Sequence, residues 1–284
     1  MKILVTGGAG FIGRSLIREL AKDPKNSIVC LDNYFTGVPD QVEGVEYING
    51  STNNIDNYLL EKPDVVYHLG EYSRIATSFE DIDKVWELNC HGTYKVIQYC
   101  RENKCKLIYA ASSSKFGNDG QDENLSPYAW IKAKNVELIK NFGEWFGLEY
   151  AIAYFYNVYG PGQITKGKYA TVIGIFLEQY KQGQPITVVS PGTQKRYFTH
   201  IDDAVAGLEM IGKHGNGDNY CLCDEKSCHS IHEVAKMFSD DIEFIEQQKG
   251  NRVDPVVSSR KCNDELGWST TKSLVKYVKG LKGE

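Results

Sequence analysis

The chain has 284 residues, of which 42% are hydrophobic and 24% charged, and its formal net charge is −5 at pH 7. This length suffices for one large α/β domain or for two lobes. The nearly balanced charge, without a block of basic residues, excludes the electrostatic footprint of a nucleic-acid-binding protein. No apolar run approaches a membrane span, and the short apolar start runs directly into glycines, unlike a signal peptide, so we expect no membrane contact and a cytoplasmic location.

The first predicted unit is a strand, a glycine turn, a helix and a second strand. A short strand at 1–5, apolar except for Lys2, leads into a turn that contains Gly7, Gly10 and Gly13, and a helical pattern follows. The second strand ends on Asp32, nineteen residues after Gly13. In this geometry the glycines let the backbone approach a pyrophosphate, the helix N-terminus faces the phosphates and the acid binds the ribose hydroxyls. The unit therefore predicts a dinucleotide site, and the carboxylate favours NAD over NADP, whose 2′-phosphate it would repel.

Strand and helix patterns alternate through the rest of the first half, which is typical of a parallel sheet with helices on both faces. Strands are predicted at 45–48, 64–69, 106–111 and 149–155. Long helices are predicted at 79–102 and 127–146. We therefore expect an α/β fold with a doubly wound parallel sheet of the Rossmann type.

The composition changes after the Gly-Pro-Gly turn at 160–162, where we expect the chain to leave the sheet and build a smaller C-terminal lobe. The further predicted elements are a strand at 186–189, a returning helix at 202–211 and an amphipathic helix at 269–281. The predicted division is an NAD-binding domain at 1–156 with a returning segment near 196–220, and a substrate-binding lobe at 157–195 and 221–284. A ligand should lie across the carboxyl-end loops of the sheet, where the lobes meet.

Ser112, Tyr128 and Lys132 are the predicted catalytic residues. Tyr128 and Lys132 are four residues apart near the start of the helix that begins after Ser126, so their side chains share one helix face. Tyrosine is a poor base at its ordinary pKa of about 10, but a lysine cation and the positive nicotinamide ring both favour the phenolate. Ser112 follows the strand at 106–111, and its hydroxyl can hold the substrate oxygen. A Tyr-x-x-x-Lys pair alone is more often a surface pair, and the dinucleotide motif upstream favours the catalytic interpretation.

Among the eight cysteines, Cys221, Cys223 and Cys228 are followed by His229 and have the appearance of a metal cluster. Their spacing lacks the paired Cys-x2-Cys knuckles of common zinc sites. Cys221 and Cys223 also fall on one face of a predicted strand at 219–223. We therefore predict buried free thiols and no metal.

Ordered motifs along nearly the whole chain resemble the extended short-chain dehydrogenase/reductase superfamily and, within it, the NAD-dependent sugar-nucleotide epimerase/dehydratase family. The motifs are TGGAGFIG at 6–13, DNYFTG at 32–37, HLG at 68–70, NCHGT at 89–93, SSS at 112–114, SPYAWIK at 126–132, YNVYGP at 156–161, GTQKR at 192–196, HIDD at 200–203 and ELGW at 265–268. The branch that the chain resembles most is that of the UDP-glucose (UDP-galactose) 4-epimerases and their N-acetylhexosamine relatives. The resemblance implies redox-neutral epimerisation at C4 of a nucleotide-diphosphate hexose, through a transient 4-keto intermediate and with tightly held NAD.

The resemblance also implies partners and site residues. It implies a homodimer in which helices 79–102 and 127–146 pair across a two-fold axis. The implied cofactor-binding residues are Gly7, Gly10, Phe11, Ile12, Gly13, Asp32, Asn33, Thr36, Gly37, Ser51, Thr52, Leu69, Gly70, Asn89, Tyr128, Lys132 and Tyr156. The implied substrate-binding residues are Glu71, Ser112, Ser113, Asn157, Arg196 and Arg252. Asn157 and the arginines would hold the diphosphate, which arginine can bind bidentately, and a surface ion pair is the alternative role for both arginines.

The chain departs from the family pattern in several places. Ser113 and Ser114 stand where 4,6-dehydratases carry an Asp-Glu pair, which disfavours elimination of water. A serine and a threonine follow Gly50 where epimerases usually carry an aspartate, which weakens one adenine contact. The segment 71–74 (EYSR) is unlike the typical epimerase stretch, and we expect it near the sugar.

Two other functions remain open from the sequence. The same triad serves a nucleotide 4-ketosugar reductase or dehydrogenase with exchangeable NAD(H). A non-catalytic dinucleotide sensor on this fold is a more remote alternative, because such proteins usually lose the tyrosine or the lysine.

Overall fold

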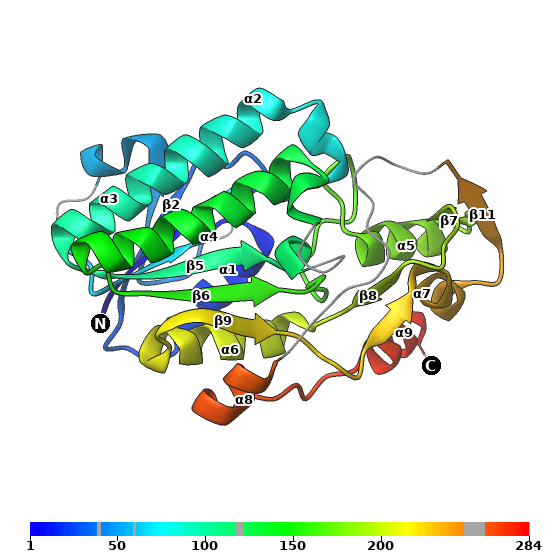
Figure 1. Cartoon of the computed structure of the whole chain (residues 1–284). Helices are drawn as coiled ribbons and strands as arrows, with labels where there is room; N and C mark the ends of the chain where they lie inside the picture. Colours follow the sequence, from blue (N-terminus) through cyan, green and yellow to red (C-terminus); the bar gives the residue numbers. More distant parts are fainter. Residues whose placement is uncertain (39–40, 59–60, 117–121, 247–258, 284) are drawn as a thin grey trace.

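The computed structural model describes residues 1–38, 41–58, 61–116, 122–246 and 259–283. Its centre is a seven-stranded sheet in the order β3-β2-β1-β4-β5-β6-β9, with every neighbouring pair parallel (Figure 1). The strands are β1 (Lys2–Thr6), β2 (Ser27–Asp32), β3 (Val45–Asn49), β4 (Val65–His68), β5 (Lys106–Ser112), β6 (Tyr150–Phe155) and β9 (Gly217–Leu222). The order from β3 to β6 is that of the dinucleotide-binding fold, so the predicted doubly wound sheet is confirmed.

Helices cover both faces of this sheet (Figure 1). The helices of one face are α1 (Phe11–Leu20), α6 (Ile201–His214) and α8 (Arg260–Leu266). The helices of the other face are α3 (Thr93–Asn103) and α4 (Pro127–Phe146), with the 3₁₀ segment η1 (Thr52–Asn57) against α3. Each face has its own cluster of buried apolar side chains, because a parallel sheet between two helix layers is hydrophobic on both sides.

Helix α4 begins and ends where its sequence predicts. The Ser126 hydroxyl accepts a hydrogen bond from the Ala129 N–H at 3.1 Å, and Pro127 occupies the first turn. Gly147 ends the helix with a φ of +70°, in the left-handed region that favours glycine. These caps fix the first turn of α4, and therefore the position of Tyr128.

The helix predicted at 79–102 is instead divided into several segments. The segments are the 3₁₀ turn η2 (Ala76–Phe79), α2 (Ile82–Val85), the π-helical η3 (Trp86–Gly92) and α3. Within η3 the Asn89 carbonyl accepts a hydrogen bond from Asn135 Nδ2 of α4 at 2.8 Å. A Cβ on Gly92 would lie 2.3 Å from Thr52 Oγ1, so the backbone of η3 also lies directly against η1. These tertiary contacts, which have no local sequence signal, account for the π-helical turn.

The second lobe lies beyond the carboxyl ends of the strands (Figure 1). Its strands form two small sheets, in which β7 (Ile186–Val189) pairs with β11 (Ile242–Ile245) and β8 (Lys195–Tyr197) pairs with β10 (Cys228–Ser230). Its helices are α5 (Val172–Lys181), α7 (Ile231–Phe238) and α9 (Leu274–Lys282). A third apolar cluster, which includes Ile173, Phe176, Val188 and Val234, forms its core.

Three boundaries of the prediction need correction. Strand β8 belongs to the second lobe, so the returning segment begins with α6 and not near 196. Helix α8 packs on β9 and α6, and Cys262 lies in the core of the main domain, so 221–284 is not wholly part of the second lobe. Helix α9 begins at Leu274, later than predicted, because the Thr271 and Lys272 N–H groups donate to the Asp203 carboxylate. Among the described residues, no helix has the length and apolarity needed to cross a membrane.

Candidate active site

The glycine turn between β1 and α1 is shaped to receive a phosphate group. Gly7 has a φ of +69°, and a Cβ on it would lie 2.6 Å from the Gly70 nitrogen. A Cβ on Gly13 would lie 2.2 Å from the Gly7 carbonyl oxygen. No side chain caps α1 at Gly10, so the first N–H groups of the helix need a partner from outside the helix. A pyrophosphate supplies such a partner, and the helix dipole favours its charge.

Asp32, at the end of β2, is 7% exposed and lies in the wall of the same cavity. Its carboxylate accepts hydrogen bonds from the Ala9 N–H at 2.9 Å and the Tyr34 N–H at 2.7 Å. Burial raises the pKa of Asp32 above its ordinary value, and the two N–H groups act in the opposite direction. Thr52 Oγ1, also in the wall, is buried without a hydrogen-bond partner among the described residues. These groups fit the ribose and adenine side of a dinucleotide.

A cavity of about 460 Å³ extends from the glycine turn to the second lobe. The sheet domain supplies the glycine turn, the ends of β2, β4 and β5, and the start of α4. The second lobe supplies Thr171, Val172, Ile173, Arg196 and Phe198. The cavity therefore lies across the carboxyl ends of the strands, as predicted for a ligand of this fold.

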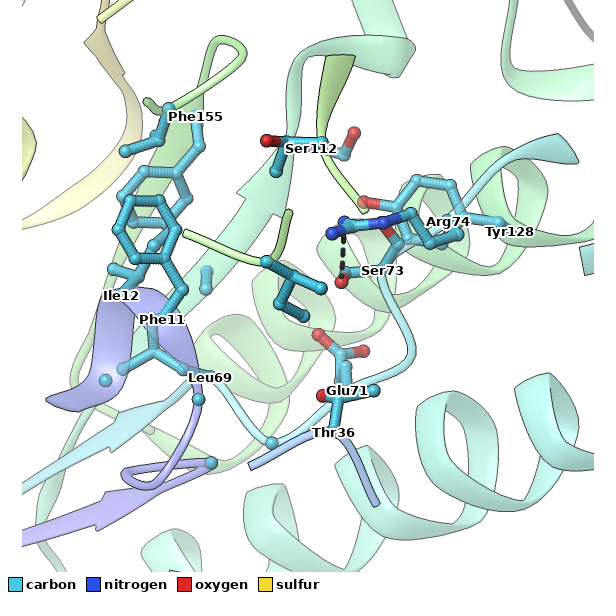
Figure 2. A pocket seen from close by; sticks show the side chains of 18 of the residues that line it. Phe11, Ile12, Thr36, Leu69, Glu71, Ser73, Arg74, Ser112, Tyr128 and Phe155 are labelled. Atoms are coloured by element: carbon cyan, nitrogen blue, oxygen red, sulfur yellow. Dashed lines mark hydrogen bonds between the residues drawn. The ribbon is translucent and has the colours of Figure 1, made fainter. Parts of the chain in front are cut away.

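Ser112, Tyr128 and Lys132 all lie in the wall of this cavity. Figure 2 shows the first two. Ser112 ends β5, and its Oγ accepts a hydrogen bond from the Ser114 N–H at 3.2 Å. Tyr128 and Lys132 project from successive turns of α4, and Tyr128 is 8% exposed. The structure thus brings together three side chains that are separated by up to twenty residues in the chain.

Glu71 was expected to bind the substrate, but its carboxylate is bound mainly by other protein groups. Its side chain is only 2% exposed, and its Oε2 accepts a hydrogen bond from Lys132 Nζ, which also donates to the Ala110 carbonyl. Its Oε1 accepts hydrogen bonds from Thr93 Oγ1, Tyr109 OH and Asn135 Nδ2, at 2.9, 3.1 and 3.0 Å. Glu71 is therefore held mainly by the protein, although it contributes to the cavity wall.

His68 connects the glycine turn with Glu71 through two hydroxyl groups. Thr93 Oγ1 donates to Glu71, so it accepts from His68 Nε2, at 2.9 Å. His68 Nδ1 then accepts from Thr6 Oγ1 at 2.7 Å, and Thr6 Oγ1 accepts from the Gly70 N–H at 3.3 Å. This network assigns the proton of the neutral ring to Nε2. Burial lowers the pKa of His68 to about 4, which agrees with a neutral ring.

A polar contact joins the two lobes beside the cavity. Asp81 binds Lys168 Nζ at 2.8 Å and accepts hydrogen bonds from Tyr169 OH at 3.0 Å and Tyr72 OH at 2.9 Å. Arg74 Nε donates to the Tyr169 carbonyl at 2.7 Å. The segment 168–169 of the second lobe thereby closes against the segment 72–81 of the sheet domain.

Three of the remaining predicted substrate-binding residues line the cavity, namely Ser113, Asn157 and Arg196. Asn157 has a φ of +36°, and its Nδ2 donates to the Tyr197 carbonyl at 2.8 Å. Arg252 lies outside the described residues.

Four of the predicted cofactor residues are not part of the cavity wall. Gly37 packs against Ala9, and Ser51 caps η1 by accepting from the Asn53 N–H at 3.3 Å. Asn89 is fully buried and binds the N–H and carbonyl of Tyr72.

Tyr156 is the fourth, and the structure places its ring in the core instead of beside the nicotinamide site. Its hydroxyl donates to Cys221 Sγ at 3.6 Å. Phe155, the preceding residue, faces the cavity instead (Figure 2). The sequence prediction did not identify Phe155, although alternation along a strand would have assigned these neighbours to opposite faces.

The fold and the site define an NAD-dependent enzyme of the short-chain dehydrogenase/reductase class. A family model for the NAD dependent epimerase/dehydratase family matches residues 3–223, and the chain belongs to this family. A putative UDP-glucose 4-epimerase of Methanocaldococcus jannaschii is 28% identical over 295 residues, which cover 98% of this chain and 96% of the relative. UDP-glucuronic acid decarboxylase 5 of Arabidopsis thaliana is 30% identical over 304 residues, which cover 99% and 87%.

A solved structure is also similar over the whole chain. UDP-glucuronic acid 4-epimerase from Bacillus cereus, in complex with UDP-glucuronic acid and NAD, has a TM-score of 0.89 and 26% identity and covers 100% of this chain and 99% of its own. Family membership therefore establishes NAD as the cofactor. The relatives include an epimerase and a decarboxylase, so family membership alone does not identify the reaction or the sugar.

Proposed function

We propose that the protein epimerises C4 of a nucleotide-diphosphate hexose, UDP-glucose/galactose or the N-acetyl analogue, through a transient 4-keto sugar. The observation that carries this proposal is the meeting of Ser112, Tyr128 and Lys132 in one cavity with the glycine turn. Ser113 and Ser114 follow Ser112, where water elimination would require carboxyl groups. This difference favours epimerisation over dehydration.

NAD supplies the hydride acceptor and donor at C4. Tyr128, as the phenolate, accepts the proton of the 4-hydroxyl group and later returns it. Ser112 donates a hydrogen bond to the 4-oxygen, and Lys132 holds the ribose next to the nicotinamide. Because the hydride taken from C4 would have to return to C4, tight retention of NAD is part of the proposal.

The second lobe binds the nucleotide sugar in this proposal, and the sheet domain binds NAD. Asn157 and Arg196 line the cavity on the side of the second lobe, and both can donate to a diphosphate. Arg252 remains a proposed second arginine ligand. While the diphosphate stays anchored, the 4-keto sugar can turn and present its other face.

We also propose a homodimer across the helical layer of α2, η3 and α4. Phe79, Ile82, Trp86 and Trp130 are 39–45% exposed and surround one hollow, and the Trp86 and Trp130 rings stack at 6.5 Å. An apolar surface of this kind is typical of a protein interface. A second copy of the chain, related by a two-fold axis, is the proposed occupant.

Proton NMR of the purified protein with UDP-glucose, UDP-N-acetylglucosamine or UDP-glucuronic acid, without added cofactor, tests the reaction. A new galacto-configured anomeric signal is the expected result, and it identifies the sugar. A pentose signal with release of CO₂ would instead establish a decarboxylase. Consumption of added NADH with a 4-ketosugar nucleotide, without epimerisation, would establish the reductase.

A further inference from the structure

The charge of Lys132 is paired inside the protein. The side chains of Lys132 and Glu71 are 7% and 2% exposed, and their charged groups are in direct contact. Three further donors hold the Glu71 carboxylate, so it can neither rotate away freely nor act alone as a base. A carboxylate this close offsets most of the field that the ammonium exerts on Tyr128. Lys132 therefore stabilises a Tyr128 phenolate less than an unpaired lysine at the same position would.

Arg74 has a positive charge without a matching carboxylate. Among the described residues its partners are neutral oxygens, namely the Tyr169 carbonyl and the carbonyl and hydroxyl of Ser73. Burial lowers the pKa of Arg74, but an arginine remains charged because its ordinary value is above 12. The Arg74 and Tyr128 side chains both line this cavity (Figure 2), and Tyr128 acts against burial by raising the pKa of Arg74.

The other titratable groups around this cluster are either neutral near pH 7 or joined in an ion pair. Burial lowers the pKa of His68 to about 4, and it raises the pKa of Cys90 to about 11. Burial likewise raises the pKa of Tyr109 well above its ordinary value. Asp81 is paired with Lys168. Glu71, Lys132 and Arg74, which all line the cavity, thus carry one positive charge in excess.

We propose that Glu71 and Arg74 are positioning residues with opposite electrostatic effects on the Tyr128 phenolate. Glu71 fixes the Lys132 ammonium against the Ala110 carbonyl and offsets its charge, while Arg74 supplies the unpaired positive charge that stabilises the phenolate. This inference rests on the base role proposed above for Tyr128. It assigns opposite effects to the two neighbours, which a purely structural role does not predict.

The test is a pH titration of tyrosinate absorbance on the NAD-bound protein, with the matching Tyr128→Phe protein subtracted from each variant. Arg74→Gln should move the midpoint of the Tyr128 titration up by about one pH unit, because a nearby cation is lost. Arg74→Lys should leave it close to the wild-type midpoint, since the charge is kept. Glu71→Gln should move it down by about one pH unit, because Lys132 becomes unpaired. Glu61→Gln, which removes a carboxylate paired with Lys2 at the surface, is the matched control and should have no effect.

Unchanged midpoints in Arg74→Gln, or shifts of the same sign in Arg74→Gln and Glu71→Gln, would overturn the proposal. If Glu71→Gln does not fold, the comparison of Arg74→Gln with Arg74→Lys still tests the role of the Arg74 charge. Arg74 is only half-buried, so we expect both of these variants to fold. The pH profile of kcat/KM should show the same shifts, with about a tenfold loss for Arg74→Gln at a pH below the midpoint. Shifted titrations without turnover of any nucleotide sugar would refute the proposed function alone, and turnover without shifts would refute this inference alone.

Discussion

At the scale of single residues, the hydrogen bonds of His68 make the site sensitive to acid. Its ring is buried between Thr6 and Thr93, and the proton on Nε2 directs the Thr93 hydroxyl towards Glu71. A second proton on Nδ1 would oppose the Thr6 hydroxyl, which donates to that atom in the neutral state. Protonation would therefore disturb both the strand before the glycine turn and the carboxylate that holds Lys132.

The pH dependence of stability follows from the lowered pKa of His68. The unfolded chain protonates this ring below about pH 6.5, whereas the folded chain does so only near pH 4. Between these values the unfolded state binds more protons, so the free energy of unfolding falls as the pH falls, by about 3 kcal/mol in total for this group. Urea unfolding of the wild type and of His68→Gln, each at pH 7 and at pH 4.5, measures this loss in the free energy of unfolding. We expect a smaller loss on acidification in His68→Gln, and equal losses would contradict the assignment.

Asp32 provides a second residue-scale prediction. Asp32→Ala should reduce the amount of NAD that copurifies with the protein, because the ribose hydroxyls lose their acceptor. Absorbance of the cofactor released by denaturation, per mole of chain, measures the occupancy. Asp23→Ala, at an exposed position, is the control, and equal occupancy in the two variants would refute the ribose contact.

At the scale of elements, the unit from β1 to β2 could be predicted because its signals are local. Gly7, Gly13 and Asp32 act through a turn, a helix start and a strand end that their own neighbours in the sequence determine. The ion pair between Glu71 and Lys132 could not be predicted, since sixty-one residues separate the partners and only tertiary packing, such as that of α4 on β5 and η3, joins them. The π-helical turn η3 depends in the same way on Asn135 of another helix. Tyr156 was predicted to lie at the cofactor by resemblance, whereas the structure places its ring, just after the end of β6, in the apolar core.

The close approach of the glycine turn to α1 gives a prediction for that element. Gly13→Ala places a Cβ 2.2 Å from the Gly7 carbonyl oxygen, so the turn must shift. We expect a loss of about 1–3 kcal/mol in the free energy of unfolding and a large loss of bound NAD. Gly280→Ala in α9, where a Cβ meets nothing within 4 Å, is the matched control. Urea unfolding and cofactor occupancy measure both effects, and a Gly13→Ala protein equal to this control would contradict the close approach.

At the scale of the whole molecule, the cavity is formed by both lobes, and contacts between the lobes lie beside it. The segment 168–169 reaches back to Asp81 and Arg74, so the lobe that we propose binds the sugar is coupled to the residues around Tyr128. The sequence predicted two lobes with a ligand between them. It did not predict this contact, because the partners lie eighty-seven residues or more apart.

The proposed homodimer is tested at this scale too. Trp130→Glu places a charge in the exposed aromatic hollow beside Trp86 and should convert the protein to a monomer, because a buried unpaired charge at an interface is unfavourable. Sedimentation velocity measures the change, from twice the mass of one chain to that of one chain. Phe244→Glu, at a 50% exposed aromatic residue of β11, should leave the mass unchanged. A wild-type monomer, or an unaffected Trp130→Glu dimer, would refute this interface.

The most direct test of the central claim is the fate of a deuterium label at C4 of the sugar that NMR identifies as the substrate. We expect the label to remain at C4 of the epimerised product, without loss to water or to added NAD, because the hydride leaves and returns within one cavity. Tyr128→Phe should keep its NAD and lose nearly all turnover. Loss of the label to the medium, or substantial turnover by Tyr128→Phe, would contradict the account.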